Sequence, residues 1–207
     1  MFDTYLINKI KSANYPIAFT GSTVSELSGF PSLDTKIHGY KIKDALTIDF
    51  FNNNPFIFYK IFKYLLEFQN VYPNYIHKTL SNLNVNIITE NFDGLHQKAG
   101  SHNVLELNNN LEYLSCQKCN YKISSKIALL NFNFPNDLSS YIVCPHCQTL
   151  LKPTLILLGE TINNFNIALN QVYKSDLLLI IGNKLNYSPA NSIFTKAKYS
   201  NNNILIL

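Results

Sequence analysis

The sequence predicts an α/β protein built on a doubly wound parallel sheet. Short apolar runs alternate along the chain with segments that have helical spacing of apolar residues, which favours parallel strands joined by helices. Leu177–Ile181 is entirely apolar, as expected of a parallel strand buried on both faces. Glycines and polar residues follow several of these runs, and open α/β sheets bind ligands at the carboxyl ends of their strands.

The composition is that of an ordinary globular protein. The 207 residues are 46% hydrophobic and 14% charged, with a net charge of +4, and they fit one domain with a small insertion. So small a charge does not argue for nucleic-acid binding. No apolar run reaches the roughly 18 residues of a membrane span, and the first residues lack a signal-peptide layout. We therefore expect a cytoplasmic protein without a membrane or specific nucleic-acid partner.

The first 30 residues predict a helix, a strand and a turn. Residues 3–13 carry apolar side chains near helical spacing, and Tyr15–Phe19 is short and apolar like a sheet strand. The strand leads through Gly21 into a run of small residues, a layout that can cradle a pyrophosphate on backbone N–H groups. A plain strand-to-helix connection explains the same residues without any ligand.

Residues 35–80 are predicted to be mostly helical. Ile57–Phe68 is dense in apolar and aromatic residues and has one polar stripe, which is typical of a helix that packs against a core. Asn52–Pro55 is predicted to be a loop that starts this helix. His77 lies in a further predicted helix, where we interpret it as structural.

The segment that follows residue 84 carries the most polar strand end. Val85–Ile88 predicts a buried strand, after which the chain turns polar at Thr89-Glu90-Asn91 and passes Asp93-Gly94. A ligand site at the carboxyl end of this strand would use these residues. Strand-to-helix loops are often polar without a ligand, so this pattern alone leaves both interpretations open.

All four cysteines of the chain fall in two CxxC pairs, Cys116/Cys119 and Cys144/Cys147. Two such pairs predict a tetrahedral structural zinc site, although the spacer, residues 120–143, exceeds the usual length of about 15–20 residues. Disulfides are the alternative, disfavoured by the absence of a secretory signal and by the strained small ring that a CxxC bridge would form. Because four thiolates complete a zinc shell, His146 is interpreted as a bystander.

The last third of the chain predicts three more strands. Leu155–Leu158 is predicted to be a strand that exits at Gly159-Glu160. Leu177–Ile181 is the buried strand described above, and it ends at Gly182. Ile204–Leu207 is predicted to be the last strand of the sheet.

Several of these stretches together resemble one family. TENFDGLHQKAG, at residues 89–100, and the following VLELNNN are similar to the sirtuin pattern TQNIDxLHxxAG…ELHG. FTGSTVSELSGFPSLD is similar to GAGxSxxSGIPxFR, LLKPTLILLGE to RPxVVxFGE, and SDLLLIIGNKL to ADLLLVIGTSL. Sirtuins are NAD-dependent protein-lysine deacylases, and some are ADP-ribosyltransferases. The resemblance covers residues 3–207, with the cysteines where the family carries its zinc.

The resemblance implies a sirtuin-type domain over residues 1–207. Its Rossmann-like core would comprise residues 15–34, 84–110 and 151–207, with a helical module at 35–80 and a zinc-ribbon module at 111–150. The implied partners are NAD or ADP-ribose and an acylated-lysine protein substrate. The residues implied to bind the cofactor are Gly21, Ser22, Ser25, Pro31, Glu90, Asn91, Asp93, Gly182, Asn183 and Lys184.

The chain departs from the family pattern where chemistry is concentrated. Asn108 stands at the place of the family's catalytic His, so it is not expected to act as a base, whereas Asn91 keeps the family's residue. Glu90 replaces Gln. Lys184 replaces Ser, and it either pairs with phosphate or is solvated. Asp34 replaces Arg. If its side chain lay about 4 Å from a dianionic ligand, one unit of charge would change the interaction energy by about 4 kcal/mol, whereas a side chain that points to solvent would have little effect.

Three functions remain open on these residues. The first is an NAD-dependent protein-lysine deacylase with impaired or altered activity, or an ADP-ribosyltransferase. The second is a non-catalytic module that binds NAD or ADP-ribose. The third is a remnant that is held together by zinc and does nothing with NAD.

Overall fold

The computed structural model describes residues 2–130, 132, 141–185, 189–200 and 203–207. Residues 133–140, inside the expected zinc module, therefore lie outside the described residues. The chain divides into two compact units, each made of separate stretches of sequence. The first unit contains residues 1–30, 71–107 and 162–207, and the second contains residues 31–70 and 108–161.

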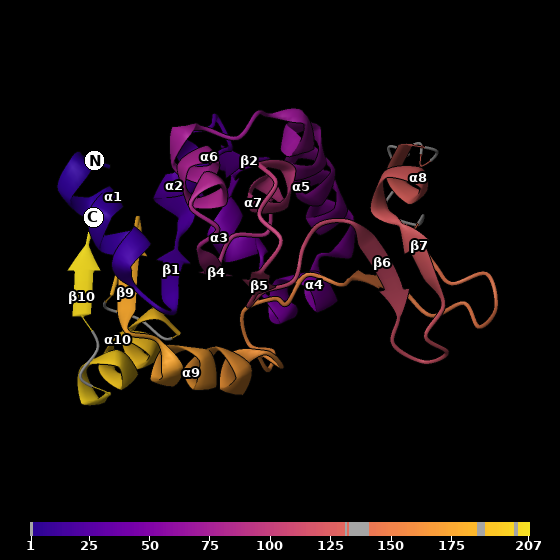
Figure 1. The fold of residues 1–207 in the computed structure, drawn as a ribbon. Coiled ribbons are helices and arrows are strands. Elements are labelled where there is room, and N and C mark those ends of the chain that lie inside the picture. The colour runs from indigo at the N-terminus through magenta and orange to yellow at the C-terminus, as the bar shows by residue number, and fades with distance from the viewer. Residues whose placement is uncertain (1, 131, 133–140, 186–188, 201–202) are drawn as a thin grey trace. The chain divides into compact units, whose positions relative to one another are not determined.

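The first unit is built on a five-stranded parallel sheet with the strand order β10-β9-β1-β4-β5 (Figure 1). The central strand β1 pairs with β4 on one side and β9 on the other, and the predicted strands at residues 15–19, 85–88, 177–181 and 204–207 are confirmed within one or two residues. The strands are β1 (Pro16–Thr20), β4 (Asn86–Thr89), β5 (Val104–Glu106), β9 (Leu177–Ile181) and β10 (Asn203–Ile206).

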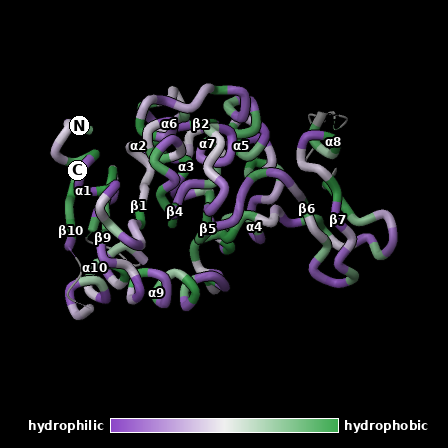
Figure 2. The backbone as a smooth tube through the Cα atoms, in the orientation of Figure 1, coloured by the Kyte–Doolittle hydropathy of each residue, from purple (hydrophilic) through white to green (hydrophobic). Residues whose placement is uncertain are grey.

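Helices cover both faces of this sheet, as predicted for a doubly wound fold. One apolar cluster joins the sheet to α1, α2 and α6, and a second joins its other face to α9 and α10. The central strands β1, β4 and β9 are buried almost throughout, as strands covered on both faces must be, and in Figure 2 much of the edge strand β10 is also green, the hydrophobic end of the scale. The helices of this unit are α1 (Thr4–Ser12), α2 (Ser22–Glu26), α6 (Tyr75–Asn82), α7 (Leu95–Lys98), α9 (Phe165–Lys174) and α10 (Ala190–Tyr199).

Short polar side chains fix where these elements begin. Asp3 caps α1 by accepting a hydrogen bond from the Leu6 N–H at 2.8 Å, which satisfies one of the donors left free at a helix start. Asn74 caps α6 in the same way. Asp176, just before β9, accepts from the backbone N–H groups of Asn14 and Tyr15 and so aligns the starts of β1 and β9.

The second unit combines small helices with a three-stranded antiparallel sheet of order β7-β6-β8. The aromatic side chains of the buried α5 pack on one another and on Phe51 of α4, and its Tyr59 hydroxyl donates to the Leu151 carbonyl of β8 at 2.5 Å. The elements are β2 (Lys36–Ile37), β3 (Tyr40–Lys41), α3 (Ile42–Ala45), α4 (Ile48–Asn53), α5 (Pro55–Glu67), the 3-10 turn η1 (Phe68–Asn70), β6 (Tyr113–Cys116), β7 (Lys122–Ser124), α8 (Ser125–Leu130) and β8 (Leu151–Pro153).

Two predictions in this unit were only partly correct. Residues 35–80 are mostly helical, but residues 36–41 form the β2–β3 hairpin, whose turn places His38 and Gly39 at positive φ. Asn52–Pro55 is not a loop throughout, because α4 continues to Asn53 and α5 begins at Pro55.

The predicted strand at Leu155–Leu158 is wrong. The antiparallel strand is Leu151–Pro153. Beyond it the backbone makes single hydrogen bonds to loops and helix ends, such as that from the Leu158 N–H to the Leu46 carbonyl at 2.9 Å. The buried ammonium of Lys152 donates to the carbonyls of Pro153 and Leu155 and pairs with Glu160 at 2.8 Å. The segment thus wraps around a buried charge instead of pairing with a strand.

Across the ranges that the structure describes, none of the helices is both long and apolar enough to cross a membrane.

Candidate functional site

Three strands of the first unit end at the same edge of the sheet. The Gly21 N–H donates to the Ile181 carbonyl at 3.0 Å, and the Glu90 N–H donates to the Thr20 carbonyl at 3.1 Å. The residues that follow β1, β4 and β9 therefore lie together, although they are far apart in the sequence. This carboxyl edge is where open parallel sheets bind their ligands.

Gly21 and Gly182 make the closest approach at this edge. A Cβ atom on Gly21 would lie 2.6 Å from the Gly182 carbonyl oxygen and closer still to the Asn183 side chain. Gly182 has a φ of +68°, and a Cβ atom there would lie 3.0 Å from the Thr23 Cβ. Neither position can carry a side chain without displacing its neighbours, so both glycines are required by the packing of this edge.

Asn183 carries a buried acceptor without a partner. Its Nδ2 group donates to the Phe19 carbonyl at 3.1 Å, which fixes the orientation of the amide. Its Oδ1 atom is buried and has no hydrogen bond among the residues that the structure describes. A buried polar atom left in this state is costly, and a hydrogen-bond donor from a ligand would satisfy it.

Asn91 and Asp93 tie the end of β4 to the turn after β1. The Asn91 Nδ2 group donates to the Gly21 carbonyl at 3.0 Å. Asp93 accepts from the Ser25 hydroxyl and, at 2.7 Å, from the Leu95 N–H. Burial raises the pKa of Asp93, while these two hydrogen bonds oppose the rise.

Glu90, just after β4, is a carboxyl group whose protonation state changes near neutral pH. Burial raises its pKa to about 7, so a sizeable fraction is protonated near neutrality. A protonated carboxyl both donates and accepts a hydrogen bond, as the amide of the family's Gln does. In its protonated state Glu90 therefore has the same capacity to donate and accept a hydrogen bond as a side-chain amide.

The remaining residues of the predicted cofactor set differ in accessibility. Ser22 is half-buried and begins α2, while Lys184 is exposed. Pro31 is half-buried and belongs to the second unit. Asp34, in the same unit, is exposed and pairs with Lys41 at 3.3 Å and Lys43 at 2.8 Å. The pKa of Asp34 is lowered chiefly by its hydrogen bond to Lys43, so its charge is partly neutralised within that unit.

The four cysteines of the second unit converge as predicted. The sulfur of Cys116 lies 3.4 Å from that of Cys147, Cys119 lies 3.4 Å from Cys144 and 3.8 Å from Cys147, and all four lie within 4.8 Å of one another. A tetrahedral zinc with Zn–S bonds of about 2.3 Å has sulfur atoms about 3.8 Å apart. All four cysteines are free, so the disulfide alternative is excluded and the geometry fits zinc.

Comparison with known proteins identifies the family. The sequence profile of the Sir2 family matches residues 29–189. The chain belongs to the Sir2 family. An NAD-dependent protein deacetylase of Caldivirga maquilingensis is 31% identical over 208 residues, covering 96% of this chain and 79% of the relative. Another, of Saccharolobus solfataricus, is 33% identical over 208 residues, covering 95% and 81%.

Solved Sir2 structures have the same fold. A Sir2 homologue in complex with NAD superposes with a TM-score of 0.85 at 25% identity, covering 100% of this chain and 82% of the other. A Sir2 protein bound to an acetylated peptide superposes with a TM-score of 0.86 at 26% identity, covering 100% and 86%. These likenesses confirm the predicted sirtuin-like α/β fold.

Two asparagines, Asn108 and Asn109, follow β5 closely. Asn108 is half-buried, and its carbonyl accepts from the Ile156 N–H at 2.9 Å in the second unit. Asn109 has a φ of +55°, a left-handed conformation that glycine adopts freely and that asparagine tolerates better than most residues. The Asn109 amide also donates to the Thr154 carbonyl at 2.9 Å. Asn109 thus holds a backbone conformation that glycine adopts freely, and its side chain helps to fix the segment that follows β5.

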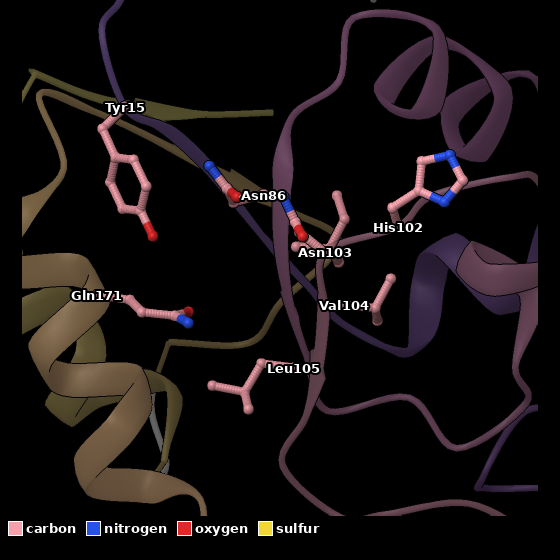
Figure 3. A pocket seen from close by; sticks show the side chains of 8 residues that line it. Tyr15, Asn86, His102, Asn103, Val104, Leu105 and Gln171 are labelled. Atoms are coloured by element: carbon pink, nitrogen blue, oxygen red, sulfur yellow. Dashed lines mark hydrogen bonds between the residues drawn. The ribbon is translucent and has the colours of Figure 1, made fainter.

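A hollow of about 480 Å³ lies at the other end of the sheet strands (Figure 3). It opens where β4 and β5 begin, and the Gln171 side chain of α9 and the Tyr15 ring flank it. No residue of the predicted cofactor set lines it. His102, which is exposed there, lies in a surface turn as predicted.

Sequence analysis missed the hydroxyl and imidazole groups beneath the carboxyl edge. His77 is fully buried, its two ring nitrogens have no hydrogen-bond partner among the described residues, and its ring centroid lies 4.7 Å from that of His96. Burial lowers the pKa of His77 to about 4 and, together with the neighbouring His77, lowers that of His96 to about 3. The structural interpretation of His77 agrees with this environment.

We predict that zinc content depends on the four thiolates alone. Cys144→Ser should reduce bound zinc from about one per chain to well below that value and lower the melting temperature, because binding a structural metal contributes to folding. Metal analysis and thermal unfolding measure both effects. His146→Ala is the matched control: His146 lies between Cys144 and Cys147, its ring packs on Tyr121, and its loss should leave the zinc content unchanged. Equal zinc loss in both variants would contradict this assignment.

We also predict that the two buried histidines make the fold sensitive to acid. The unfolded chain binds a proton on each near pH 6.5, whereas the folded chain does so only near pH 4 and 3. Their stabilising effect is therefore complete above pH 6.5 and declines as pH falls, by up to about 1.4 kcal/mol per pH unit for each histidine. In urea unfolding at pH 5–6.5, His77→Phe should reduce this slope by about half. His102→Gln, on the surface, should not change it.

Proposed function

We propose that the chain binds NAD at the carboxyl edge of its parallel sheet. The family membership supports this, as do the buried Asn183 Oδ1 atom that lacks a donor and the side-chain-free approach at Gly21 and Gly182. Backbone exposed at a glycine turn can approach a pyrophosphate closely. The residues proposed to hold the cofactor are Gly21, Ser22, Ser25, Pro31, Glu90, Asn91, Asp93, Gly182, Asn183 and Lys184.

We further propose that the chain is a protein-lysine deacylase of low activity. When bound, NAD would supply a glycosidic carbon that an acyl-lysine oxygen can attack as nicotinamide leaves. The resemblance assigns the subsequent removal of a ribose hydroxyl proton to a His, at whose position this chain has Asn108. An amide can donate and accept hydrogen bonds but does not titrate near neutral pH. Loss of a positioned general base slows such a step by about 10²–10⁴-fold.

The other residues proposed for the site would act by orientation. Asn91, held by its bond to the Gly21 carbonyl, would present its remaining carbonyl oxygen at a fixed angle. Asp93, held by Ser25 and the Leu95 N–H, would accept from a ligand amide or hydroxyl. Lys184, exposed just after β9, would supply a cation to a pyrophosphate.

Asn108 also favours a second candidate, a module that binds NAD or ADP-ribose without turnover. ADP-ribosyl transfer is a related possibility, since it needs attack at the same carbon but less of the later base chemistry. Titration calorimetry with NAD separates a remnant from a binder, and mass spectrometry of nicotinamide release with an acetylated peptide separates a binder from an enzyme. Gly21→Ala, whose Cβ would collide with Asn183, should abolish binding. Binding equal in the variant and the unsubstituted chain would place the cofactor elsewhere.

We predict that Asn108→His raises the rate of deacetylation. If the missing proton acceptor is the main defect, kcat on an acetylated peptide should rise by up to about 10²–10⁴-fold, with a rate that falls as the new imidazole is protonated below pH 6.5. Asn108→Gln is the matched control, because it keeps an amide and should leave the rate low. Deacetylation by the unsubstituted chain at ordinary rates of about 0.1–1 per second or more would contradict this account.

A further inference from the structure

A chain of buried hydrogen bonds runs beneath the carboxyl edge, across the seam between β1 and β4. The Thr20 hydroxyl lies 2.9 Å from the Thr89 hydroxyl and 2.9 Å from the His96 Nε2 atom. The Thr89 hydroxyl lies 3.3 Å from the Thr20 carbonyl oxygen. Thr20 and Thr89 end their strands, and His96 lies on α7, so three separate elements contribute to this chain.

The number of hydroxyl protons limits which atom can donate in each hydrogen bond of this network. Each threonine hydroxyl has one proton to donate. Thr89 donates to the Thr20 carbonyl, and Thr20 donates to the Thr89 oxygen. In this arrangement the Thr20 oxygen accepts from His96, so the Nε2 atom of His96 carries the proton.

The surroundings of His96 agree with this tautomer. The side chain is 2% exposed, and its pKa, lowered to about 3, keeps the ring neutral at physiological pH. A neutral imidazole has one N–H group, and the Nδ1 atom has no hydrogen-bond partner among the described residues. If the proton were on Nδ1, this buried donor would be unsatisfied, and Thr20 would have to donate to His96. Thr89 would then have to donate to the Thr20 hydroxyl and give up its bond to the Thr20 carbonyl.

This hydrogen-bond network ends at two residues of the candidate site, Asn91 and Gly21. The Thr89 oxygen also accepts the backbone N–H of Asn91 at 3.0 Å, and the Asn91 side chain donates to the Gly21 carbonyl at 3.0 Å. His96 does not itself belong to the predicted cofactor set. Through the two hydroxyls it is thereby linked to Asn91, which follows β4, and to Gly21, which follows β1. Every hydroxyl in the chain has a donor and an acceptor, which makes a network of this kind rigid.

We propose that His96 is a positioning residue, which, as the neutral Nε2–H tautomer, orients Asn91 and Gly21 for the cofactor through the hydroxyls of Thr20 and Thr89. This inference rests on the proposed function for its ligand, but the tautomer and the hydrogen-bond chain do not. The two parts can therefore be tested separately.

The first test compares two substitutions of Thr89 by the calorimetric affinity for NAD. Thr89→Val keeps the shape but removes the hydroxyl, so the Asn91 N–H loses its acceptor, and NAD should bind about tenfold more weakly. Thr89→Ser restores the hydroxyl while losing a methyl group, and its affinity should stay within about twofold of the unsubstituted chain. A purely structural role would make the serine variant, which leaves a cavity, at least as defective as the valine variant.

Ser101→Ala provides the matched control. The Ser101 hydroxyl is buried beside this network, since its own N–H donates to the His96 carbonyl, but the hydroxyl has no hydrogen bond among the described residues. Its removal should leave NAD affinity unchanged. An effect of Ser101→Ala as large as that of Thr89→Val would overturn the inference.

The second test needs no cofactor. Long-range proton–nitrogen correlation spectra of the ¹⁵N-labelled chain should show His96 as the Nε2–H tautomer, with its N–H protected from exchange, and Thr20→Val should abolish that protection. A ring proton on Nδ1, or a rapidly exchanging ring, would overturn the hydrogen-bond chain itself. If the unsubstituted chain does not bind NAD, the proposed function and the cofactor role of His96 both fail. Equal NAD affinity in Thr89→Val and Thr89→Ser would overturn this inference alone.

Discussion

Strand β1 is paired on both sides, with β4 and with β9, and the candidate site depends on that register. Phe19 pairs with Ile88 and Ile180, so the three strands reach the same edge together. The two neighbours lie about 70 and 160 residues further along the chain. Because parallel pairing requires long crossovers, each strand delivers a different loop to that edge. The close approach of Gly21 to Gly182 and the bond between Gly21 and Asn91 are both consequences of this arrangement.

The electrostatics of the edge are unusual for a site proposed to hold an anionic cofactor. Glu90 and Asp93 are acidic, and Lys184 is exposed. Burial raises the pKa of Glu90 to about 7, which reduces its negative charge near neutral pH and lets it donate a hydrogen bond. Burial also raises the pKa of Asp93, although its hydrogen bonds from Ser25 and the Leu95 N–H oppose the rise. Desolvation thus moderates a repulsion that the sequence alone suggests. Asp34 raises no comparable conflict, since Lys41 and Lys43 of its own unit hold it.

In the second unit, the cysteine cluster and a buried ammonium group join segments that are separate in the sequence. Four sulfur atoms converge from the end of β6 with the turn after it and from the loop that precedes β8, so a metal there would join two segments that also pair through β6 and β8. Lys152 plays a corresponding part for the segment that follows. Its buried ammonium is stable only because the carbonyls of Pro153 and Leu155 and the carboxylate of Glu160 surround it. Removing any one of these partners would leave the buried ammonium of Lys152 with too few groups to compensate its charge.

The sequence by itself determined the features that depend on neighbouring residues. Hydrophobic periodicity located four of the five strands of the parallel sheet but not the short edge strand β5, and the CxxC spacing located the cysteine cluster, because these patterns are local. Tertiary structure alone decided where distant groups meet. The seam of Thr20, Thr89 and His96 joins residues 69 and 76 positions apart, and no local pattern reveals it. Leu155–Leu158 has the composition of a strand, yet the buried charge of Lys152 and carbonyls from other segments determine its path.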